Sequence, residues 1–428
     1  MTEYSKMSLD DLYAEYDRVA AAYEEYKSRG LSLDMSRGKP GTDQMDLSYA
    51  LFHQIDDGSG YASRTGRDCR NYGGLDGLDE LKELFGEILG VPAAQVVVAG
   101  NSSLNLMFDF LTQAMTKGLH GGTPWLKEKK LKFLCPAPGY DRHFAVTEYY
   151  DFDMITIPMN EDGPDMDLVE RLAASDPAIK GIWCVPKYSN PLGVTYSDEV
   201  VRRLARMETA ASDFVIMWDN AYVVHYLKDE LAPLANIYEE CVAAGHPDRV
   251  MLFTSTSKIT FPGAGLAAMA ASPSLIGEVK HRMSYQTIGP DKLNQLRHAR
   301  MFHSVEDVLA HMKRHAAILR PKFQTVLDAL QKNLDGLGIA KWTDPDGGYF
   351  ISLDVMEGCA ARVAALCKDA GLILTGAGAT YPYGRDPHDS NLRIAPSYPS
   401  VEELAAAADL LCVAVKLACL EKLTGRTL

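Results

Sequence analysis

Short apolar runs alternate with longer amphipathic segments between Val96 and Ala270. This alternation is typical of an α/β domain with a mostly parallel sheet. The runs are apolar throughout, as expected of strands that are buried on both faces. Seven strands are predicted, at residues 96–99, 132–136, 154–158, 181–186, 214–219, 250–254 and 265–270. Ligands of such sheets bind beyond the carboxyl ends of the strands, so the polar residues there are the first candidates for a functional site.

The segments on either side of this region predict a second, smaller unit. Residues 8–27 and 304–333 have helical periodicity behind Ser-x-x-Asp caps, and the second helix contains Pro321. Residues 348–353, 371–374 and 391–395 are predicted to be short strands between helices. We therefore expect a large α/β domain at residues 50–300, with its seven-stranded sheet between helices, and a smaller α+β domain at residues 301–428 to which residues 1–49 contribute.

Charge and composition narrow the class of protein. The 428 residues carry a net charge of −14, which disfavours binding to nucleic acid and to anionic membranes. The sequence starts MTEYSKMSLDD without an apolar signal segment, and the apolar stretch from Leu404 to Leu420 is interrupted by charges and reads as a core-facing helix behind a capping box. None of the eight cysteines forms a C-x-x-C motif. These features predict a cytoplasmic protein with buried free thiols.

Two motifs at predicted strand ends carry an acid, a phenol and a lysine. Asp219-Asn-Ala-Tyr222 ends one apolar run, and Ser255-Thr-Ser-Lys258 ends another. Pyridoxal phosphate requires such a set: an amine to bind its aldehyde reversibly, a carboxylate to keep its pyridine nitrogen protonated, and a hydroxyl donor beside its ring oxygen. The two motifs together indicate a site for this cofactor.

The chain resembles the fold-type I aminotransferases, which depend on pyridoxal phosphate, over nearly its whole length. The matching segments occur in the family's order: Tyr72-Gly-Gly-Leu-Asp-Gly77, Gly100-Asn-Ser-Ser103, Pro138-Gly-Tyr140, Asn190-Pro-Leu-Gly193, Asp219-Asn-Ala-Tyr222, Ser255-Thr-Ser-Lys258 and Asn391-Leu-Arg393. The segments MSRGKP, GNSSLNLM and VPKYSNPLGV look like a divergent bacterial subgroup of aspartate aminotransferases, called type Ic.

The resemblance implies a role for each residue around the cofactor ring. Lys258 would bind the aldehyde and then act as the base that moves a proton. Without the other motifs, a lysine in a Ser-x-Ser-Lys sequence would instead be interpreted as a solvated loop residue. Asp219 would pair with the pyridine nitrogen, although a carboxylate after a strand can also cap a helix. Tyr222 and Asn190 would donate hydrogen bonds to the ring oxygen, and Tyr140 would stack on the ring instead of packing in the core.

The cofactor's phosphate would bind where Gly100-Asn-Ser-Ser103 leads into a helix. Ser102 and Ser103 are the expected ligands, although either could be a plain helix cap. In the family, hydroxyl groups at the positions of Ser255 and Ser257 add contacts. A tyrosine at the position of Tyr72 reaches the phosphate of the neighbouring subunit, which implies a homodimer.

One position departs from the pattern. Many relatives have an arginine that neutralises the phosphate after the Pro-Gly turn that follows the lysine, whereas this chain has Gly265 there. A cation from the segment that contains Arg64, Arg67 and Arg70 is the expected replacement, and we expect weaker retention of the cofactor.

The resemblance also implies how the substrate is bound. Arg393 would grip the α-carboxylate bidentately, beside Asn190, although a structural salt bridge is the alternative. Gly38 belongs to a loop that closes over the substrate in this family. The distal carboxylate of a dicarboxylic amino acid needs a further cation, and the candidates are Arg37, Lys39, Arg142 and Lys187, with Arg37 favoured.

The reaction that we predict is ping-pong transfer of the amino group of L-aspartate to 2-oxoglutarate. An aminotransferase or β-lyase for alanine, aromatic or other amino acids is the alternative within this chemistry. A non-catalytic amino-acid sensor that binds pyridoxal phosphate is a remote alternative, because such a protein normally carries a basic DNA-binding module. A nicotinamide dehydrogenase is disfavoured because residues 96–103 contain no G-x-G-x-x-G.

Overall fold

A computed structural model describes residues 2–56, 58 and 60–428. Its centre is an eight-stranded sheet in the order β2-β9-β8-β7-β6-β3-β4-β5. The strands are β2 (Val96–Val98), β3 (Lys132–Ala137), β4 (Asp153–Asn160), β5 (Gly163–Pro164), β6 (Ile179–Cys184), β7 (Val215–Asp219), β8 (Val250–Ser255) and β9 (Ala267–Ala270). All seven predicted strands are confirmed. The eighth, β5, was missed because two residues are too short to form an apolar run.

The direction of the strands explains where polar residues gather. Strands β4, β3, β6, β7 and β8 are parallel neighbours, whereas β9 runs antiparallel to both β8 and β2, and β5 runs antiparallel to β4. The carboxyl ends of the five parallel strands therefore lie along one edge of the sheet. The sequence predicted the mostly parallel sheet correctly.

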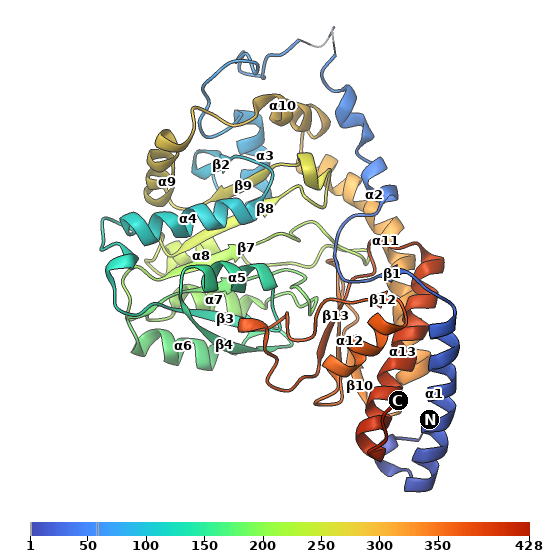
Figure 1. The fold of residues 1–428 in the computed structure, drawn as a ribbon. Coiled ribbons are helices and arrows are strands. Elements are labelled where there is room, and N and C mark those ends of the chain that lie inside the picture. The colour runs from blue at the N-terminus through green and yellow to red at the C-terminus, as the bar shows by residue number, and fades with distance from the viewer. Residues whose placement is uncertain (1, 57, 59) are drawn as a thin grey trace.

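Helices cover both faces of this sheet (Figure 1). One face packs on α4 (Ser103–Lys117), α5 (Asp141–Tyr149) and α9 (Pro273–Gln286). The other packs on α3 (Asp79–Leu89), α6 (Met166–Ser175), α7 (Asp198–Arg206), α8 (Ile237–Ala243) and α10 (Lys292–Met301). Successive side chains of strand β7 point to opposite faces: Met217 packs in the core on the α4 side, and Trp218 packs in the core on the α3 side.

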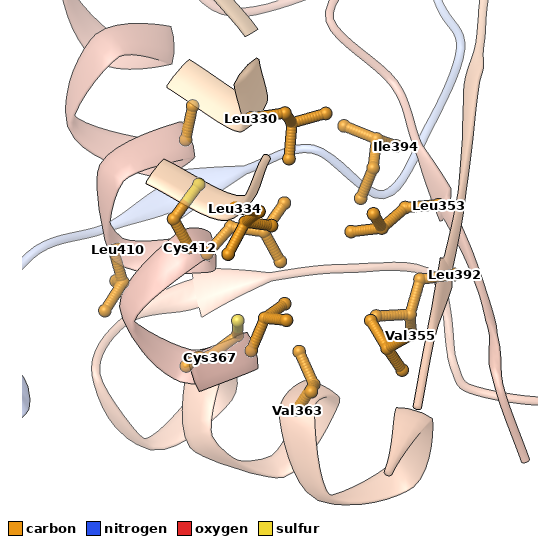
Figure 2. Packing of buried hydrophobic residues seen from close by; sticks show 14 of the residues in the cluster. Leu330, Leu334, Leu353, Val355, Val363, Cys367, Leu392, Ile394, Leu410 and Cys412 are labelled. Carbon is orange, nitrogen blue, oxygen red and sulfur yellow. The ribbon is translucent and has the colours of Figure 1, made fainter. Parts of the chain in front are cut away.

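A third core lies beside the sheet and contains both ends of the chain (Figure 1). It is built from α1 (Leu9–Ser28), α11 (Val305–Leu334), α12 (Ala360–Asp369), α13 (Val401–Thr424) and the antiparallel strands β10 (Ala340–Trp342), β11 (Ile351–Val355) and β13 (Asn391–Ile394). Figure 2 shows Leu330 and Leu334 of α11 packed between Leu353 of β11 and Cys412 of α13. The predicted helices and strands are confirmed here, and β10 was missed.

The amino-terminal segment packs in this third core. Strand β1 (Leu33–Asp34) pairs in parallel with β12 (Leu372–Ile373), and α2 (Thr42–Asp46) follows it. Ser8, Ser304 and Ser400 cap α1, α11 and α13, and α11 continues through Pro321. The expected domain boundary near residue 300 stays a prediction. Among the described residues, no helix is both long and apolar enough to cross a bilayer.

Candidate active site

Lys258 lies just beyond β8, at the edge of the sheet where the parallel strands end. Its Nζ is 5.1 Å from the ring centroid of Tyr222 and 5.7 Å from that of Tyr349. Burial lowers the pKa of the Lys258 amine, the charge of Asp219 opposes this shift, and Arg393 adds to it. The lysine, the acid and the arginine that the sequence singled out therefore share one electrostatic environment.

Asp219 ends β7 and is 3% exposed. Its Oδ2 atom accepts a hydrogen bond of 2.9 Å from Nε2 of His143, whose ring stacks on Trp183 at a centroid distance of 4.2 Å. Its Oδ1 atom is buried and has no hydrogen-bond partner in the described chain. A buried carboxylate with one oxygen held and the other free suits a cationic ring N–H as its partner.

The sequence interpretation missed His143. It lies in the first turn of α5, three residues after Tyr140, so the two side chains share a face, with ring centroids 4.9 Å apart. The i, i+3 spacing from a predicted ring-stacking residue was the available signal. The partner of His143 lies 76 residues further along the chain, and only the fold reveals it.

The phenols beside this carboxylate are neutral. Burial, followed by the nearby charge of Asp219, raises the pKa of Tyr140 to about 12. Burial also raises the pKa of Tyr222 well above its usual value. Both hydroxyl groups therefore keep their protons and can donate hydrogen bonds.

The expected phosphate ligands lie together. Ser102 is the N-cap of α4, yet its side chain makes no capping hydrogen bond and stays available. Ser257 Oγ donates to the Asn101 carbonyl at 3.4 Å and accepts from Ser255 Oγ at 3.0 Å, which joins the loop after β8 to the start of α4. Gly100 before it has φ +66°, a conformation that favours glycine. Hydroxyl groups beside the free N–H groups of a helix start suit an anion.

Gly265 has no room for a side chain. A Cβ atom there would lie 2.8 Å from Thr256 Oγ1 and 2.9 Å from the Phe261 carbonyl oxygen. Of the three expected replacement cations, Arg64 pairs with Glu83 at 2.5 Å and Arg70 with Asp68 at 2.7 Å. No ion pair of Arg67 is found in the described chain; its guanidinium lies beside the backbone of Gly74.

Arg393 lies on β13 and is buried. Its Nη1 atom donates to Asp141 Oδ1 at 2.8 Å and to Asn190 Oδ1 at 3.3 Å. Its Cζ atom is 4.9 Å from the ring centroid of Phe350. The salt bridge that the sequence left as the alternative is therefore present, with Asp141 as a partner that the sequence interpretation missed. A substrate carboxylate would share or replace this contact.

The loop that contains Gly38 packs beside Arg393. A Cβ atom on Gly38 would lie 2.4 Å from Phe350 Cζ. Thr375 Oγ1 donates to the Ser36 carbonyl at 2.6 Å and accepts from Arg393 Nε at 3.4 Å. Both contacts bring the loop to the arginine, and its closure over a substrate stays a prediction.

The four candidates for a distal-carboxylate cation are separated. Arg37 and Arg142 are exposed, and Lys39 lies 3.8 Å above the ring of Tyr398. Lys187 is buried in a cavity with Trp218, on the opposite face of β7 from Asp219. Lys187 is therefore not part of the catalytic site.

A buried polar network below Lys258 was also missed. Tyr349 donates to the Lys258 carbonyl at 3.5 Å, and Gln44 Nε2 donates to the Tyr349 hydroxyl at 2.8 Å. His311 and His315 contact the Ile259 carbonyl through Nε2 at 2.8 and 3.0 Å. The network holds the backbone on which Lys258 is mounted, and it joins residues too distant in sequence for pattern reasoning.

Tyr72 is 80% exposed, and no active-site contact of its ring is found in the described chain. Its expected role across a dimer stays a prediction.

The chain is similar to known proteins over nearly its whole length. The profile of the family described as aspartate amino-transferase matches residues 6–427. The chain is 47% identical over 423 residues to an aspartate aminotransferase of Corynebacterium glutamicum, covering 97% of this chain and 98% of that protein. The crystal structure of an aspartate transaminase from the same species superposes with a TM-score of 0.95 at 47% identity, over 97% and 98% of the two chains.

A more distant structure shares the fold. The α-aminoadipate aminotransferase of Thermus thermophilus, solved in complex with N-(5'-phosphopyridoxyl)-L-leucine, superposes with a TM-score of 0.72 at 20% identity. The alignment covers 97% of this chain and all of that one.

Proposed function

Because this chain belongs to the aspartate aminotransferase family, it is an aminotransferase, and we propose that it transfers the amino group of L-aspartate to 2-oxoglutarate with pyridoxal phosphate as its cofactor. Its fold is that of the fold-type I aminotransferases. The observation that carries the cofactor assignment is the free Oδ1 of buried Asp219, in the same electrostatic environment as Lys258. A carboxylate in that position supports a protonated ring nitrogen.

The other residues of the site fit the remaining parts of this cofactor. Lys258 Nζ would bind the aldehyde, and Tyr140 would lie against the ring. Tyr222 and the Asn190 amide would donate to the ring oxygen. The phosphate would be held by a set of hydroxyl groups and a helix start, comprising Ser102, Ser103, Ser255 and Ser257. When bound, pyridoxal phosphate supplies an electron sink for the carbanion that forms at the substrate α-carbon.

The protein's residues then have the following tasks. Arg393 orients the α-carboxylate of the amino acid, with its guanidinium set by Asp141 and Asn190. Lys258 Nζ, as the neutral amine, would take the substrate α-proton and deliver it, within the same half-reaction, to the cofactor carbon that carried the aldehyde, and its lowered pKa favours the neutral form. His143 holds the Asp219 carboxylate in place through their hydrogen bond.

Aspartate as the amino donor is supported by the near full-length relative that carries this activity in its name. We assign the distal carboxylate to Arg37. It follows the Met35–Ser36 backbone, which is anchored beside Arg393, and its exposed side chain can turn toward a bound substrate. Arg37→Ala should raise KM for aspartate at least tenfold and leave KM for alanine unchanged.

Two further assignments belong to this proposal. The enzyme is a homodimer in which Tyr72 completes the neighbouring site, supported by exposed apolar side chains in adjoining segments: Tyr72 is 80% and Ile288 is 65% exposed, and Gly73 touches Gly289. It works in the cytoplasm, supported by eight free, buried cysteines.

A donor screen tests the proposed activity. Purified enzyme with added pyridoxal phosphate is assayed for 2-oxoglutarate-dependent keto-acid formation from aspartate, alanine and phenylalanine. We expect the highest kcat/KM with aspartate and parallel lines in double-reciprocal plots, as a ping-pong mechanism requires. A preference for alanine or phenylalanine would contradict the aspartate assignment, and ammonia release without a keto-acid acceptor would identify a lyase.

A further inference from the structure

A cavity with both apolar and polar lining residues lies on the opposite face of β7 from the catalytic site. It has a volume of about 380 Å³ and lies between the end of α3, the loop at residues 231–236 and the start of α11. This volume suits a small metabolite. Ile88, Trp218 and Leu234 line it with apolar surface, and Lys187 and Asn220 are two buried polar residues of its wall.

Lys187 is the first sign of a ligand. It is 4% exposed; its ammonium group lies 5.8 Å from the ring centroid of Tyr188, and no ion pair of that group is found in the described chain. The equally buried Lys180 shows the usual arrangement, since it pairs with Glu128 at 2.8 Å and Asp213 at 3.0 Å. Burying an unpaired ammonium group is unfavourable, and burial accordingly lowers the pKa of Lys187 to about 8. At neutral pH this amine is mostly protonated and lacks an anionic partner.

Asn220 is the second, independent sign. It is 5% exposed. Its backbone N–H donates to the Phe253 carbonyl at 2.8 Å, and its backbone carbonyl accepts from the Thr254 hydroxyl at 3.1 Å. Its side-chain Oδ1 is buried without a hydrogen-bond partner in the part of the chain that the structure describes. Such an oxygen requires an N–H or O–H donor.

We propose that this cavity binds a small organic acid with a hydroxyl or amino group next to its carboxylate and an apolar side chain. The carboxylate pairs with Lys187, the neighbouring donor satisfies Asn220 Oδ1, and the side chain packs on Ile88, Trp218 and Leu234. Asn220 directly follows Asp219, and Lys187 precedes Asn190 by three residues. The occupant therefore contacts the chain directly behind two residues of the catalytic site.

The test uses the holoenzyme and 2-hydroxy-4-methylpentanoate, which has no amino group and cannot be transaminated. Binding is measured by calorimetry at pH 7, and the ligand is located by soaking crystals. We expect one molecule in the cavity, at least tenfold weaker binding in Lys187→Met, and binding that weakens as the pH rises above about 8. In the wild type, 4-methylpentanoate, which lacks the hydroxyl group, should bind several-fold more weakly.

Two variants separate this cavity from other sites. Lys228→Met removes an exposed lysine that pairs with Asp346 outside the cavity, and it should bind as the wild type does. Arg393→Lys alters the catalytic site and should also retain binding. No binding to the wild type, unchanged binding in Lys187→Met, or loss of binding in Arg393→Lys alone would overturn the proposal. A melting temperature of Lys187→Met at or above that of the wild type shows that the variant is folded.

Discussion

His143 is the residue that fixes the position of the Asp219 carboxylate. It supplies the hydrogen bond of 2.9 Å that orients the buried carboxylate. A hydrogen bond to a charged group contributes about 1.5–3 kcal/mol. We therefore expect His143→Leu to lower kcat by about 10- to 100-fold.

Steady-state kinetics and the pH dependence of the bound cofactor's visible absorption check this prediction. His143→Gln, which keeps a side-chain N–H donor, should recover part of the loss. A His143→Leu enzyme with the wild-type kcat and absorption profile would show that Asp219 needs no support from this residue.

Lys187 predicts a pH dependence of stability with a definite sign. Its pKa is about 8 in the folded protein against 10.5 unperturbed, so between these values the unfolded chain binds more protons. The cost of the buried charge is complete below pH 8 and fades as the pH rises toward 10.5. It amounts to roughly 1.4 kcal/mol for each pH unit in that interval, or about 3 kcal/mol in all.

Thermal melts of the wild type and of Lys187→Met from pH 7 to 10 measure the contribution of Lys187 to stability. The other lysines are present in both proteins, so their contributions cancel in the comparison. Lys187→Met should be the more stable protein at pH 7, and the difference between the two proteins should shrink steadily as the pH rises to 10. A wild type that is more stable than Lys187→Met at pH 7, by an amount that stays constant up to pH 10, would mean that Lys187 has an anionic partner in the folded protein.

The loop between β8 and β9 explains the absent phosphate arginine. Thr256 Oγ1 accepts from the Leu266 backbone N–H at 2.8 Å, and this bonded hydroxyl occupies the space that a Cβ on Gly265 would need. Gly265→Ala should lower stability by about 1–3 kcal/mol. Gly265→Arg should lower stability further, and it should not tighten binding of the cofactor.

Gly263→Ala is the matched control, because its Cβ would meet no atom within 4 Å. Thermal melts and titration with pyridoxal phosphate compare the three variants with the wild type. A Gly265→Arg protein that melts higher and binds the cofactor more tightly would contradict this account of the loop.

The elements that carry the site could be predicted because their residues repeat a local pattern. Strands β7 and β8 are apolar runs that end in Asp219 and in Ser255, so both the strand ends and their chemistry are visible in the sequence. Strands β5 and β10 are too short for such a pattern. A strand of two or three residues is defined by its partner, which only the fold supplies.

The contacts missed from sequence all join distant segments. His143 meets Asp219, and Asp141 meets Arg393 across 252 residues. Sequence reasoning could mark Arg393 as needing a partner, since a buried guanidinium must be paired, but it could not choose which one. Lys187 was a candidate for binding the distal carboxylate because it is near Asn190 in the sequence. In the structure it lies beside Trp218, on the face of the sheet opposite Asp219.

At the scale of the whole molecule, the proposed dimer makes a prediction about shared sites. If Tyr72 acts in the neighbouring subunit, a hybrid dimer of Lys258→Ala and Tyr72→Phe subunits has one site with both defects and one intact site. Mixed and refolded subunits should then regain about half of the wild-type activity per hybrid dimer, although each parent variant is impaired.

The hybrid is isolated with two different affinity tags, and unmixed Lys258→Ala is the control for recovery without exchange. If Tyr72 acts within its own subunit, neither site of the hybrid is intact, and its activity stays at or below half that of the Tyr72→Phe parent. A monomer in sedimentation experiments would contradict the dimer itself.

The central claim is that Lys258 carries pyridoxal phosphate in an aminotransferase site. The most direct test reduces the purified holoenzyme with sodium borohydride, digests it, and locates the phosphopyridoxyl group by mass spectrometry. We expect the label on Lys258, no label in Lys258→Ala, and loss of transamination in that variant. Labelling of another lysine, such as the low-pKa Lys187, together with an active Lys258→Ala enzyme, would contradict the account.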